Sequence, residues 1–330
     1  MKENRILKSI VFVAITFALL LTLTVPTHAA SVRGVEKIEN IPYTAPVPQH
    51  TQGNLLDLYI PDVPGKNKLP LVIWTSGSAW MSDAGKSVPP DVVSHFTEKG
   101  YAVSGVSIRS NTQVQFPGQL HDIRAAIRWL RENADEYNID PNRIAILGNS
   151  SGGWAAAIAA TTSNIWQLEG ETNVQTSSAV QAAVPFFPPV DLLVMNEQEY
   201  TIMDHYAPNA PGSILMGFPI QDHPELTRKT NPITYIDDNM PPMHIFHGYN
   251  DVIVPHGQSV LLYEALALAG NEVSFTSVPS AGHDHRQIIG ASEYTVFHTN
   301  RGGQERIGVQ PAPTWESVER FINKSLNRAR

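Results

Sequence analysis

The sequence predicts an α/β protein in which helices cover both faces of a mostly parallel sheet. Short apolar runs at residues 71–74, 143–147 and 243–247 are typical of buried strands. They alternate with helical segments, of which residues 119–137 are the clearest because their apolar side chains fall on one stripe. Strands that alternate with helices form βαβ units, and such units build parallel sheets covered on both faces.

Residues 1–30 are expected to be a secretory signal peptide. Three basic residues precede an apolar run over residues 10–23, and cleavage is expected after Ala29 or Ala30. An uncleaved membrane anchor is the less favoured alternative, because the run is short for a span of about 20 residues. Residues 31–330 would then form the mature domain.

The remaining elements follow in chain order. After an arm over residues 31–53, strands are expected at 55–60, 71–74, 101–108, 143–147, 180–184, 243–247 and 272–278, and helices at 88–99, 119–137, 150–161, 256–269 and 315–326. Residues 188–240 and 285–313 do not fit this alternation of strands and helices and are expected to be irregular. Long loops in compact domains usually carry function, so residues 188–240 are expected to form a cap-like insertion that shapes the substrate pocket.

The composition excludes several classes of protein. With 42% hydrophobic and 16% charged residues, the chain is neither disordered nor a membrane bundle. Removing residues 1–30, with three basic residues and one acidic residue, changes the formal charge from −8 to −10. No cluster of Lys or Arg stands out, which argues against nucleic acid as a partner. The absence of Cys excludes disulfides, thiol catalysis and a lipid anchor on an N-terminal Cys.

The strongest motif is Gly148-Asn149-Ser150-Ser151-Gly152, which fits G-x-S-x-G between a predicted strand and a predicted helix. In that context the serine occupies a strained turn that exposes its hydroxyl, and larger flanking side chains would collide with neighbouring backbone. Ser150 is therefore the predicted nucleophile. Ser151 is expected to contribute its backbone N–H to an oxyanion hole. A Gly/Ser turn without chemistry is the less favoured alternative.

A serine nucleophile needs a base, which an acid in turn orients. Asp251 follows a predicted strand at its carboxyl end, where the sites of open α/β sheets gather, and is the expected acid, with loop capping as its alternative role. Weaker candidates for the acid lie in the irregular segment: Asp191, Asp222, Asp237 and Asp238.

His283, in a small-residue turn after another predicted strand, is the expected base, and His285 is its rival. A metal site at His283 and His285 is less favoured, because no third ligand accompanies them at a recognisable spacing.

Two further features flank the predicted nucleophile. The turn at residues 75–80 follows an early strand and is rich in small residues, so a second backbone donor of the oxyanion hole is expected there. Trp80 and Trp154 are candidate contacts for an aromatic acyl group or a sugar ring, although packing is the commoner role of a tryptophan. In the helix at 119–137, Asp122, Arg124 and Arg128 are expected to form structural salt bridges.

With these residues together, the chain resembles the α/β-hydrolase superfamily. It is similar in particular to small carboxylesterases related to hormone-sensitive lipase and to feruloyl and acetyl-xylan esterases. The resemblance covers most of residues 50–285. Where the family usually has His-Gly-Gly-Gly-Trp, this chain has Ser-Gly-Ser-Ala-Trp at residues 76–80. The resemblance implies that Gly77 and Ser78 hold the places of the usual oxyanion donors.

These observations predict a secreted, extracellular serine carboxylesterase that works through an acyl-serine intermediate without cofactor or metal. The expected substrate is a small or polysaccharide-linked ester, with acetyl and feruloyl esters of plant polysaccharide as candidates. A secreted serine peptidase, a lipase of the same fold and a catalytically inactive binding protein are the alternatives. Stable membrane insertion after signal cleavage is not expected.

Overall fold

A computed structural model describes residues 34–328, except 65–67, 166, 167, 169, 171 and 173. The predicted signal peptide, residues 1–30, lies outside the described residues. Within them, no helix has both the length and the apolar character that a membrane span requires.

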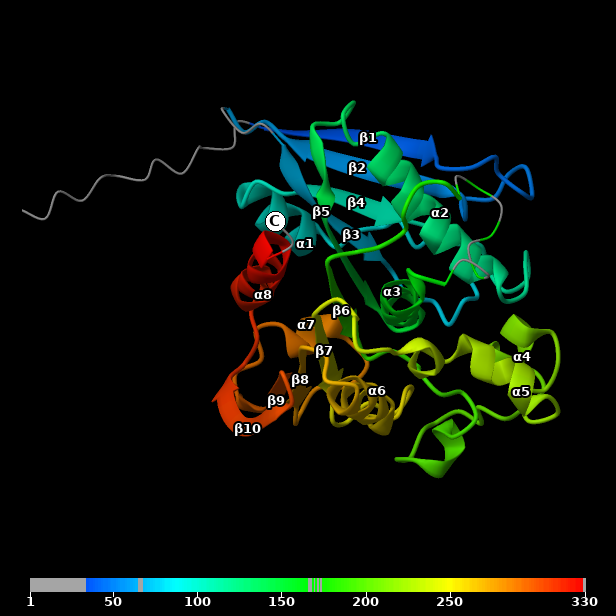
Figure 1. Cartoon of the computed structure of the whole chain (residues 1–330). Coiled ribbons are helices and arrows are strands. Elements are labelled where there is room, and N and C mark those ends of the chain that lie inside the picture. Colours follow the sequence, from blue (N-terminus) through cyan, green and yellow to red (C-terminus); the bar gives the residue numbers. More distant parts are fainter. Residues whose placement is uncertain are drawn as a thin grey trace, which may run out of the picture.

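One ten-stranded sheet forms the centre of the described chain (Figure 1). Its strands are β1 (Val35–Pro42), β2 (Leu55–Pro61), β3 (Leu69–Thr75), β4 (Ala102–Val106), β5 (Ile139–Asn149), β6 (Ala182–Phe186), β7 (Met243–Gly248), β8 (Val273–Val278), β9 (Tyr294–Arg301) and β10 (Gln304–Pro311). They lie side by side in the order β1-β2-β4-β3-β5-β6-β7-β8-β9-β10. The strands from β4 to β8 in this order are mutually parallel, while β1, β2, β9 and β10 pair antiparallel at the two edges. The predicted α/β class with a mostly parallel sheet is confirmed.

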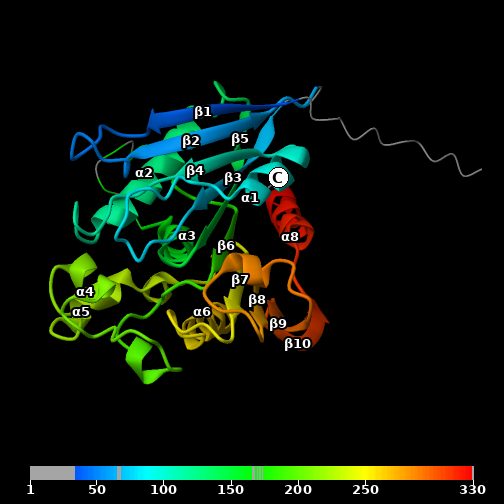
Figure 2. The ribbon, with the colours of Figure 1, turned by 180° about the vertical axis from the view of Figure 1, so that it is seen from behind.

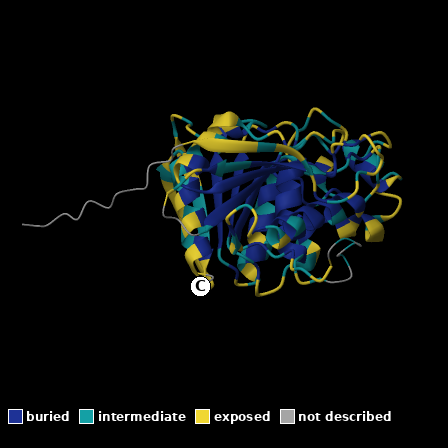
Figure 3. Ribbon diagram, turned by 90° about the horizontal axis from the view of Figure 1, so that it is seen from above, coloured by how far each residue is buried: buried dark blue, intermediate teal, exposed yellow. Residues whose placement is uncertain are grey.

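Helices cover both faces of the sheet, as Figures 1 and 2 show from opposite sides. One face carries α2 (Gly118–Glu132), α3 (Ser151–Thr162) and α6 (Gly257–Leu268), and the other carries α1 (Pro90–Glu98), α7 (His285–Ile288) and α8 (Trp315–Arg328). Each face has its own cluster of buried apolar side chains. In Figure 3, buried residues fill the middle of the molecule, and exposed residues lie on its outer helices, loops and edge strand. The two layers of helices pack on the sheet and hold the ends of its parallel strands in place.

The segment at 188–240 lacks strands and contains only short helices, in agreement with the prediction. They are α4 (Pro211–Met216), α5 (Pro224–Thr227) and three single turns at Met195–Glu197, Arg228–Thr230 and Pro232–Tyr235. In Figure 1, α4 and α5 lie beside the sheet rather than on either covering layer.

The prediction that residues 285–313 are irregular is wrong. They form α7 and the hairpin β9–β10, which extends the sheet beyond β8. Gly302 and Gly303 make the turn, with φ of 58° and 78°. A two-residue turn with positive φ at both positions matches the twist of the flanking strands, and glycine adopts it without strain.

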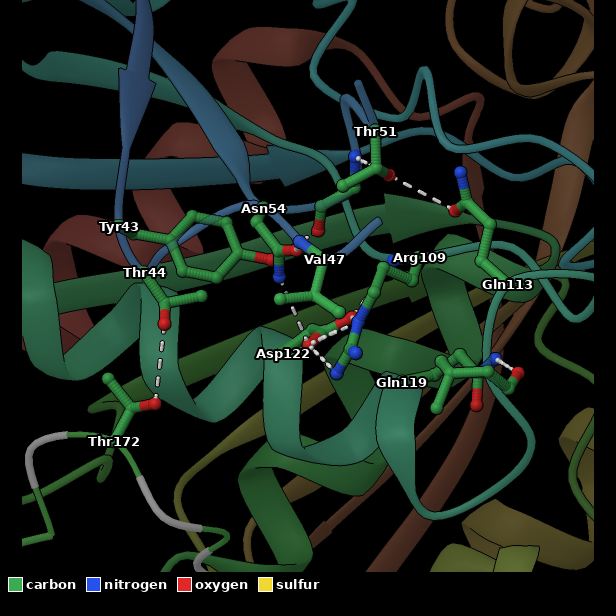
Figure 4. Close-up of polar contacts among 12 residues, drawn as sticks. Tyr43, Thr44, Val47, Thr51, Asn54, Arg109, Gln113, Gln119, Asp122 and Thr172 are labelled. Carbon is green, nitrogen blue, oxygen red and sulfur yellow. Dashed lines mark hydrogen bonds and ion pairs between the residues drawn. The ribbon is translucent and has the colours of Figure 1, made fainter. Parts of the chain in front are cut away.

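A buried polar network joins the start of β2, the end of β4 and α2 (Figure 4). The guanidinium of Arg109 donates to the Asp122 carboxylate, with an Nη2–Oδ1 distance of 2.7 Å, and Asn54 donates to the same oxygen at 3.4 Å. Asp122 is thus a structural salt-bridge residue, as predicted. In addition, Arg124 donates to the Ser178 hydroxyl at 3.0 Å, and Arg128 donates to the Thr172 carbonyl at 2.9 Å, both in the segment after α3.

Candidate active site

Ser150 lies on a sharp turn between β5 and α3. Its φ of 56° and ψ of −127° are rarely adopted by a residue with a side chain. A Cβ at Gly148 would come within 2.3 Å of the Gly152 carbonyl oxygen, and a Cβ at Gly152 within 2.0 Å of the Thr75 carbonyl oxygen. Only glycine fits at these two positions, as expected for a turn that presents the serine hydroxyl above the sheet.

The three predicted triad residues lie within hydrogen-bonding distance of one another. His283 Nε2 is 2.9 Å from Ser150 Oγ, and His283 Nδ1 is 2.7 Å from Asp251 Oδ2. They come from the loops that follow the parallel strands β5, β7 and β8. An ionised carboxylate only accepts hydrogen bonds, so Nδ1 carries the proton. The Nε2 lone pair of the neutral ring then faces the Ser150 hydroxyl.

Asp251 is buried, and the surrounding groups keep it ionised. Its Oδ1 accepts hydrogen bonds from the N–H groups of Ile253 and Val254, at 2.8 Å and 3.0 Å. Burial raises the pKa of Asp251, but hydrogen bonds from His247 and His283 outweigh it and hold that pKa well below its usual value. The carboxylate therefore remains charged over the working pH range.

His247 is a contributor to the site that the sequence did not single out. Its fully buried ring lies 3.2 Å from Asp251 Oδ2 through Nε2, while Nδ1 lies 2.7 Å from Ser259 Oγ. The signal in the sequence was its place at the end of β7, four residues before Asp251. His247 thus contacts the same carboxylate oxygen of Asp251 as His283 does.

His285, the alternative base, and the four alternative acids lie outside the hydrogen-bond chain of Ser150, His283 and Asp251. The ring of His285 packs edge-on against Trp74, with centroids 5.3 Å apart, on the face of the sheet that carries α8. The ring of His283 packs instead on Phe187, at 4.4 Å. Among the described residues, none of the four rival aspartates is hydrogen-bonded to His283, and no group of three His, Asp or Glu side chains is arranged as a metal site.

The loop at residues 76–80 differs from the expected oxyanion arrangement. The N–H of Gly77 donates to Asn149 Oδ1 at 3.1 Å, and the N–H of Ser78 donates to Ser151 Oγ at 2.9 Å. Both predicted donors are therefore engaged by side chains of the nucleophile turn. The Ser151 hydroxyl also accepts from the Trp80 N–H at 3.3 Å. Sequence spacing could not reveal these side-chain anchors.

The backbone N–H groups of Ala79 and Ser151, unlike those of Gly77 and Ser78, are not engaged by side chains of the nucleophile turn. Ala79 has a positive φ of 53° and lines the cavity beside Ser150, and within the described chain its N–H donates no hydrogen bond. Ser151 is the first residue of α3, where a backbone N–H has no partner within the helix. The available pair of donors is therefore Ala79 and Ser151, so the donor in the loop moves one residue beyond Ser78.

A small cavity of about 40 Å³ adjoins Ser150. Most of its wall comes from the segment at 188–240, and the remainder comes from the loop that follows Asp251, from the nucleophile turn and from Ala79 and Trp80. Trp80 lines this cavity, but Trp154 does not. The Trp154 side chain is fully buried, donates to the Thr230 carbonyl at 2.7 Å and packs edge-on against Trp80. The expectation that Trp154 contacts substrate is therefore wrong.

Comparison with known proteins agrees with this architecture. Residues 56–266, well over half of the chain, match the BD-FAE family. The chain belongs to the BD-FAE family. The expected resemblance to the esterase branch of the α/β-hydrolases, and the expected α/β-hydrolase fold, are confirmed.

Individual relatives of this BD-FAE chain extend the comparison. It is 31% identical to Esterase LipQ of Mycobacterium tuberculosis over 236 residues, which cover 70% of this chain and 54% of that protein. The chain spans about half the length of the curated relatives it matches.

Two solved structures are similar to the BD-FAE chain. A bifunctional GH43-CE protein of Bacteroides eggerthii is 34% identical, with a TM-score of 0.68, over 76% of this chain and 36% of that one. A truncated carbohydrate esterase from gut microbiota is 30% identical, with a TM-score of 0.67, over 77% and 90%. The first match is thus to part of a larger chain, and the second covers most of the truncated chain.

Proposed function

We propose that this protein is a secreted serine carboxylesterase that removes short acyl groups from carbohydrate esters. The observation that carries the proposal is the continuous hydrogen-bond chain from the Ser150 hydroxyl through His283 to the Asp251 carboxylate. A serine hydroxyl is a weak nucleophile near neutral pH, and this arrangement supplies a base oriented to remove its proton.

In the first half of the reaction, Ser150 Oγ attacks the carbonyl carbon of the ester while His283 Nε2 takes the serine proton. The negative charge on the carbonyl oxygen is stabilised by the N–H groups of Ala79 and Ser151, and by the positive end of α3. The bond from the carbonyl carbon to the alcohol oxygen then breaks. His283 gives its proton to that oxygen, and the acyl group stays on Ser150.

Water completes the reaction. His283 Nε2 takes a proton from a water molecule, whose oxygen attacks the acyl carbon, and the same two N–H groups stabilise the charge again. The acyl–serine bond breaks, Ser150 regains a proton from His283, and the carboxylic acid leaves. Asp251 stabilises the imidazolium in both halves of the reaction and does not itself take the proton.

The size of the cavity favours a short acyl group. A space for one water molecule needs roughly 10–15 Å³, so the cavity beside Ser150 accommodates only a few non-hydrogen atoms. An acetyl group fits this volume, whereas a feruloyl group exceeds it. The name of the gut-microbiota carbohydrate esterase supports a sugar as the alcohol, and the pattern of residues 1–30 supports export.

A substrate panel on the mature protein tests the proposal. We expect p-nitrophenyl acetate to be hydrolysed with a higher kcat/KM than p-nitrophenyl hexanoate or methyl ferulate, and aminoacyl-nitroanilides to remain uncleaved. Ser150→Ala should abolish both hydrolysis and labelling by a fluorophosphonate. Ser94→Ala, at an exposed serine on α1, is the matched control and should retain both. Labelling that survives Ser150→Ala would contradict the assigned nucleophile, and preference for the hexanoyl ester would contradict the acyl length.

A further inference from the structure

A groove of about 460 Å³ lies on the β9–β10 hairpin, which forms one edge of the sheet beside α8 (Figure 1). We call it the hairpin groove. The sheet face on which it lies is the one that α8 covers, because the His244 ring packs against both Phe297 of β9 and Phe321 of α8. The groove is lined by Phe297, Thr299 and Arg301 of β9 and by Gln304, Arg306 and Gly308 of β10.

Positive charge gathers around the hairpin groove. Arg301 Nε lies 3.2 Å and Lys324 Nζ 3.5 Å from the same carboxylate oxygen of Glu272, and Arg328 pairs with the other oxygen. Arg306 is exposed and makes no ion pair or side-chain hydrogen bond within the described part of the chain. One carboxylate therefore serves three cations, and Arg306 adds a fourth.

The charge of the groove is opposite to that of the protein as a whole. The chain carries a formal charge of −8. The neighbouring acid of the hairpin, Glu305, belongs to the opposite face, where its Oε1 accepts from the Tyr263 hydroxyl at 2.9 Å. A local excess of positive charge attracts anions, so charge complementarity favours an anionic ligand for this groove.

The groove also offers an uncovered aromatic side chain. Phe297 is paired across the hairpin with Gly308, and a Cβ at Gly308 would meet no atom within 4 Å. The space beside the Phe297 ring is therefore open. Glycine in the interior of a strand often marks a place where a ligand approaches closely. An aromatic ring beside arginines suits a ligand that has both an apolar face and a negative group.

We propose that the hairpin groove binds a saccharide that carries carboxylates, with a carboxylate on Arg306 and Arg301 and a sugar ring on Phe297. A guanidinium binds a carboxylate through two parallel hydrogen bonds, and the C–H face of a sugar ring packs on an aromatic ring. The choice of a saccharide rests on the proposed function. Nucleic acid fits less well, because its charges, spaced about 1.7 Å apart along the duplex, would extend onto the negative remainder of the surface.

The hairpin groove is separate from the catalytic site. β10 lies five places from β5 in the sheet, which corresponds to about 24 Å at about 4.8 Å per strand. The hairpin turn lies at the level of the start of β8, whereas Ser150 follows the end of β5, so the two sites occupy opposite ends of the parallel strands. A second attachment of this kind would hold the enzyme on a charged polymer between reactions.

Calorimetric titration with tri-galacturonate and with its neutral trimethyl ester tests the proposal. The mature Ser150→Ala protein is used for both, so that the methyl ester is not consumed, and the wild type should bind tri-galacturonate with the same Kd. We expect the charged trisaccharide to bind at least about tenfold more tightly than the ester, because charge-assisted hydrogen bonds are lost in the ester. Raising NaCl from about 0.1 M to about 1 M should weaken the binding of tri-galacturonate.

Two substitutions assign the binding to the groove. Arg306→Gln removes a cation without a partner, and Gly308→Val fills the space beside Phe297 without changing the charge. Each should raise the Kd for tri-galacturonate by about tenfold or more. Arg228→Gln, at an exposed arginine of the segment at 188–240, is the matched control and should bind as the parent protein does. All three changes, made in the wild type, should leave hydrolysis of p-nitrophenyl acetate unchanged.

Equal affinity for the acid and its ester, or an unchanged Kd in either groove variant, would overturn the assignment. A changed Kd in Ser150→Ala would place the saccharide at the catalytic site, and tighter binding of a DNA trinucleotide would assign the groove to nucleic acid. Circular dichroism verifies folding, and if one groove variant does not fold, the other decides. Failure of the proposed function looks different: the wild type would not hydrolyse p-nitrophenyl acetate or react with a fluorophosphonate, whatever tri-galacturonate does.

Discussion

The two sides of the site are built in different ways. On the catalytic side, Ser150, Asp251 and His283 leave the ends of parallel strands, and their polar atoms are hydrogen-bonded to one another. On the cavity side, the wall comes largely from the strandless segment at 188–240, where His205 Nε2 is buried and has no hydrogen-bond partner among the described residues. A packed sheet holds reacting atoms at bonding distance, whereas a loop wall tolerates changes of shape. In the proposed reaction, the bond-making groups and the acyl pocket therefore come from different parts of the chain.

The largest expected effect is on the catalytic side. Asp251→Asn should lower kcat by about 10⁴-fold, because the amide favours the wrong tautomer of His283 and does not stabilise its cation. Hydrolysis of p-nitrophenyl acetate measures this loss. Asp135→Asn, at an exposed aspartate paired with Lys68, is the control and should behave as wild type. A comparable kcat for Asp251→Asn would show that another carboxylate orients the base.

The anchor of the oxyanion loop gives the next effect. Ser151→Ala removes the hydroxyl that accepts from the N–H groups of Ser78 and Trp80, so the Ala79 N–H should be less well held. We expect kcat to fall about 10- to 100-fold with a smaller change in KM, less than the complete loss of one oxyanion donor. Steady-state kinetics beside Ser94→Ala tests this. A change confined to KM would refute the anchoring role.

The cavity wall should affect selectivity more than rate. Leu192→Ala enlarges the cavity, so the ratio of kcat/KM for hexanoate over acetate should rise by about tenfold, in line with the energy of burying added methylenes. Leu268→Ala, at a leucine that is 92% exposed, should leave the ratio unchanged. If Leu192→Ala lowered activity on both esters equally, the wall would serve catalysis, and the contrast between the two sides would fail.

The smallest expected effect is on the pH dependence of stability, and it comes from two buried histidines. His244 lies on β7, and His256 directly precedes α6. Burial lowers the pKa of His244 and of His256 to about 3, from 6.5 in the unfolded chain. The unfolded state therefore binds more protons between these values, and stability falls as the pH drops below 6.5 towards 3.

One pH unit below the unfolded pKa, each histidine should have lost about 1.4 kcal/mol of stabilisation. Urea unfolding of the wild type and of His244→Gln across this range measures the difference. An equally steep decline in His244→Gln would show that His244 does not contribute.

Much of the fold and of the catalytic constellation was predictable from local patterns. Apolar runs, the G-x-S-x-G turn and small-residue loops after strands are short-range features, and each reports its own backbone environment. The hairpin β9–β10 was missed because β10 is largely exposed and β9 mixes exposed, part-buried and buried positions, so neither strand has the apolar run of a buried strand. The Gly-Gly turn at residues 302–303 was the available signal.

The errors in the site have a common cause. Gly77 and Ser78 were chosen by their position in a loop, but their N–H groups are engaged by Asn149 and Ser151, more than 70 residues away in the chain. Trp154 was chosen by its closeness to Ser150 in sequence, yet α3 turns its ring into the core. The spacing of residues in the sequence does not specify which hydrogen-bond donor pairs with which acceptor when the two lie far apart in the chain.

Local chemistry in the chain was enough to predict the three residues that the structure brings into one hydrogen-bond chain, Ser150, His283 and Asp251, because a strained glycine-flanked turn and polar residues after buried strands leave clear patterns. Three-dimensional packing determined which oxyanion donors are available, how His247 supports Asp251, and how residues 188–240 close a small cavity. These features depend on contacts between segments far apart along the chain, which form only when the sheet brings the strand ends together.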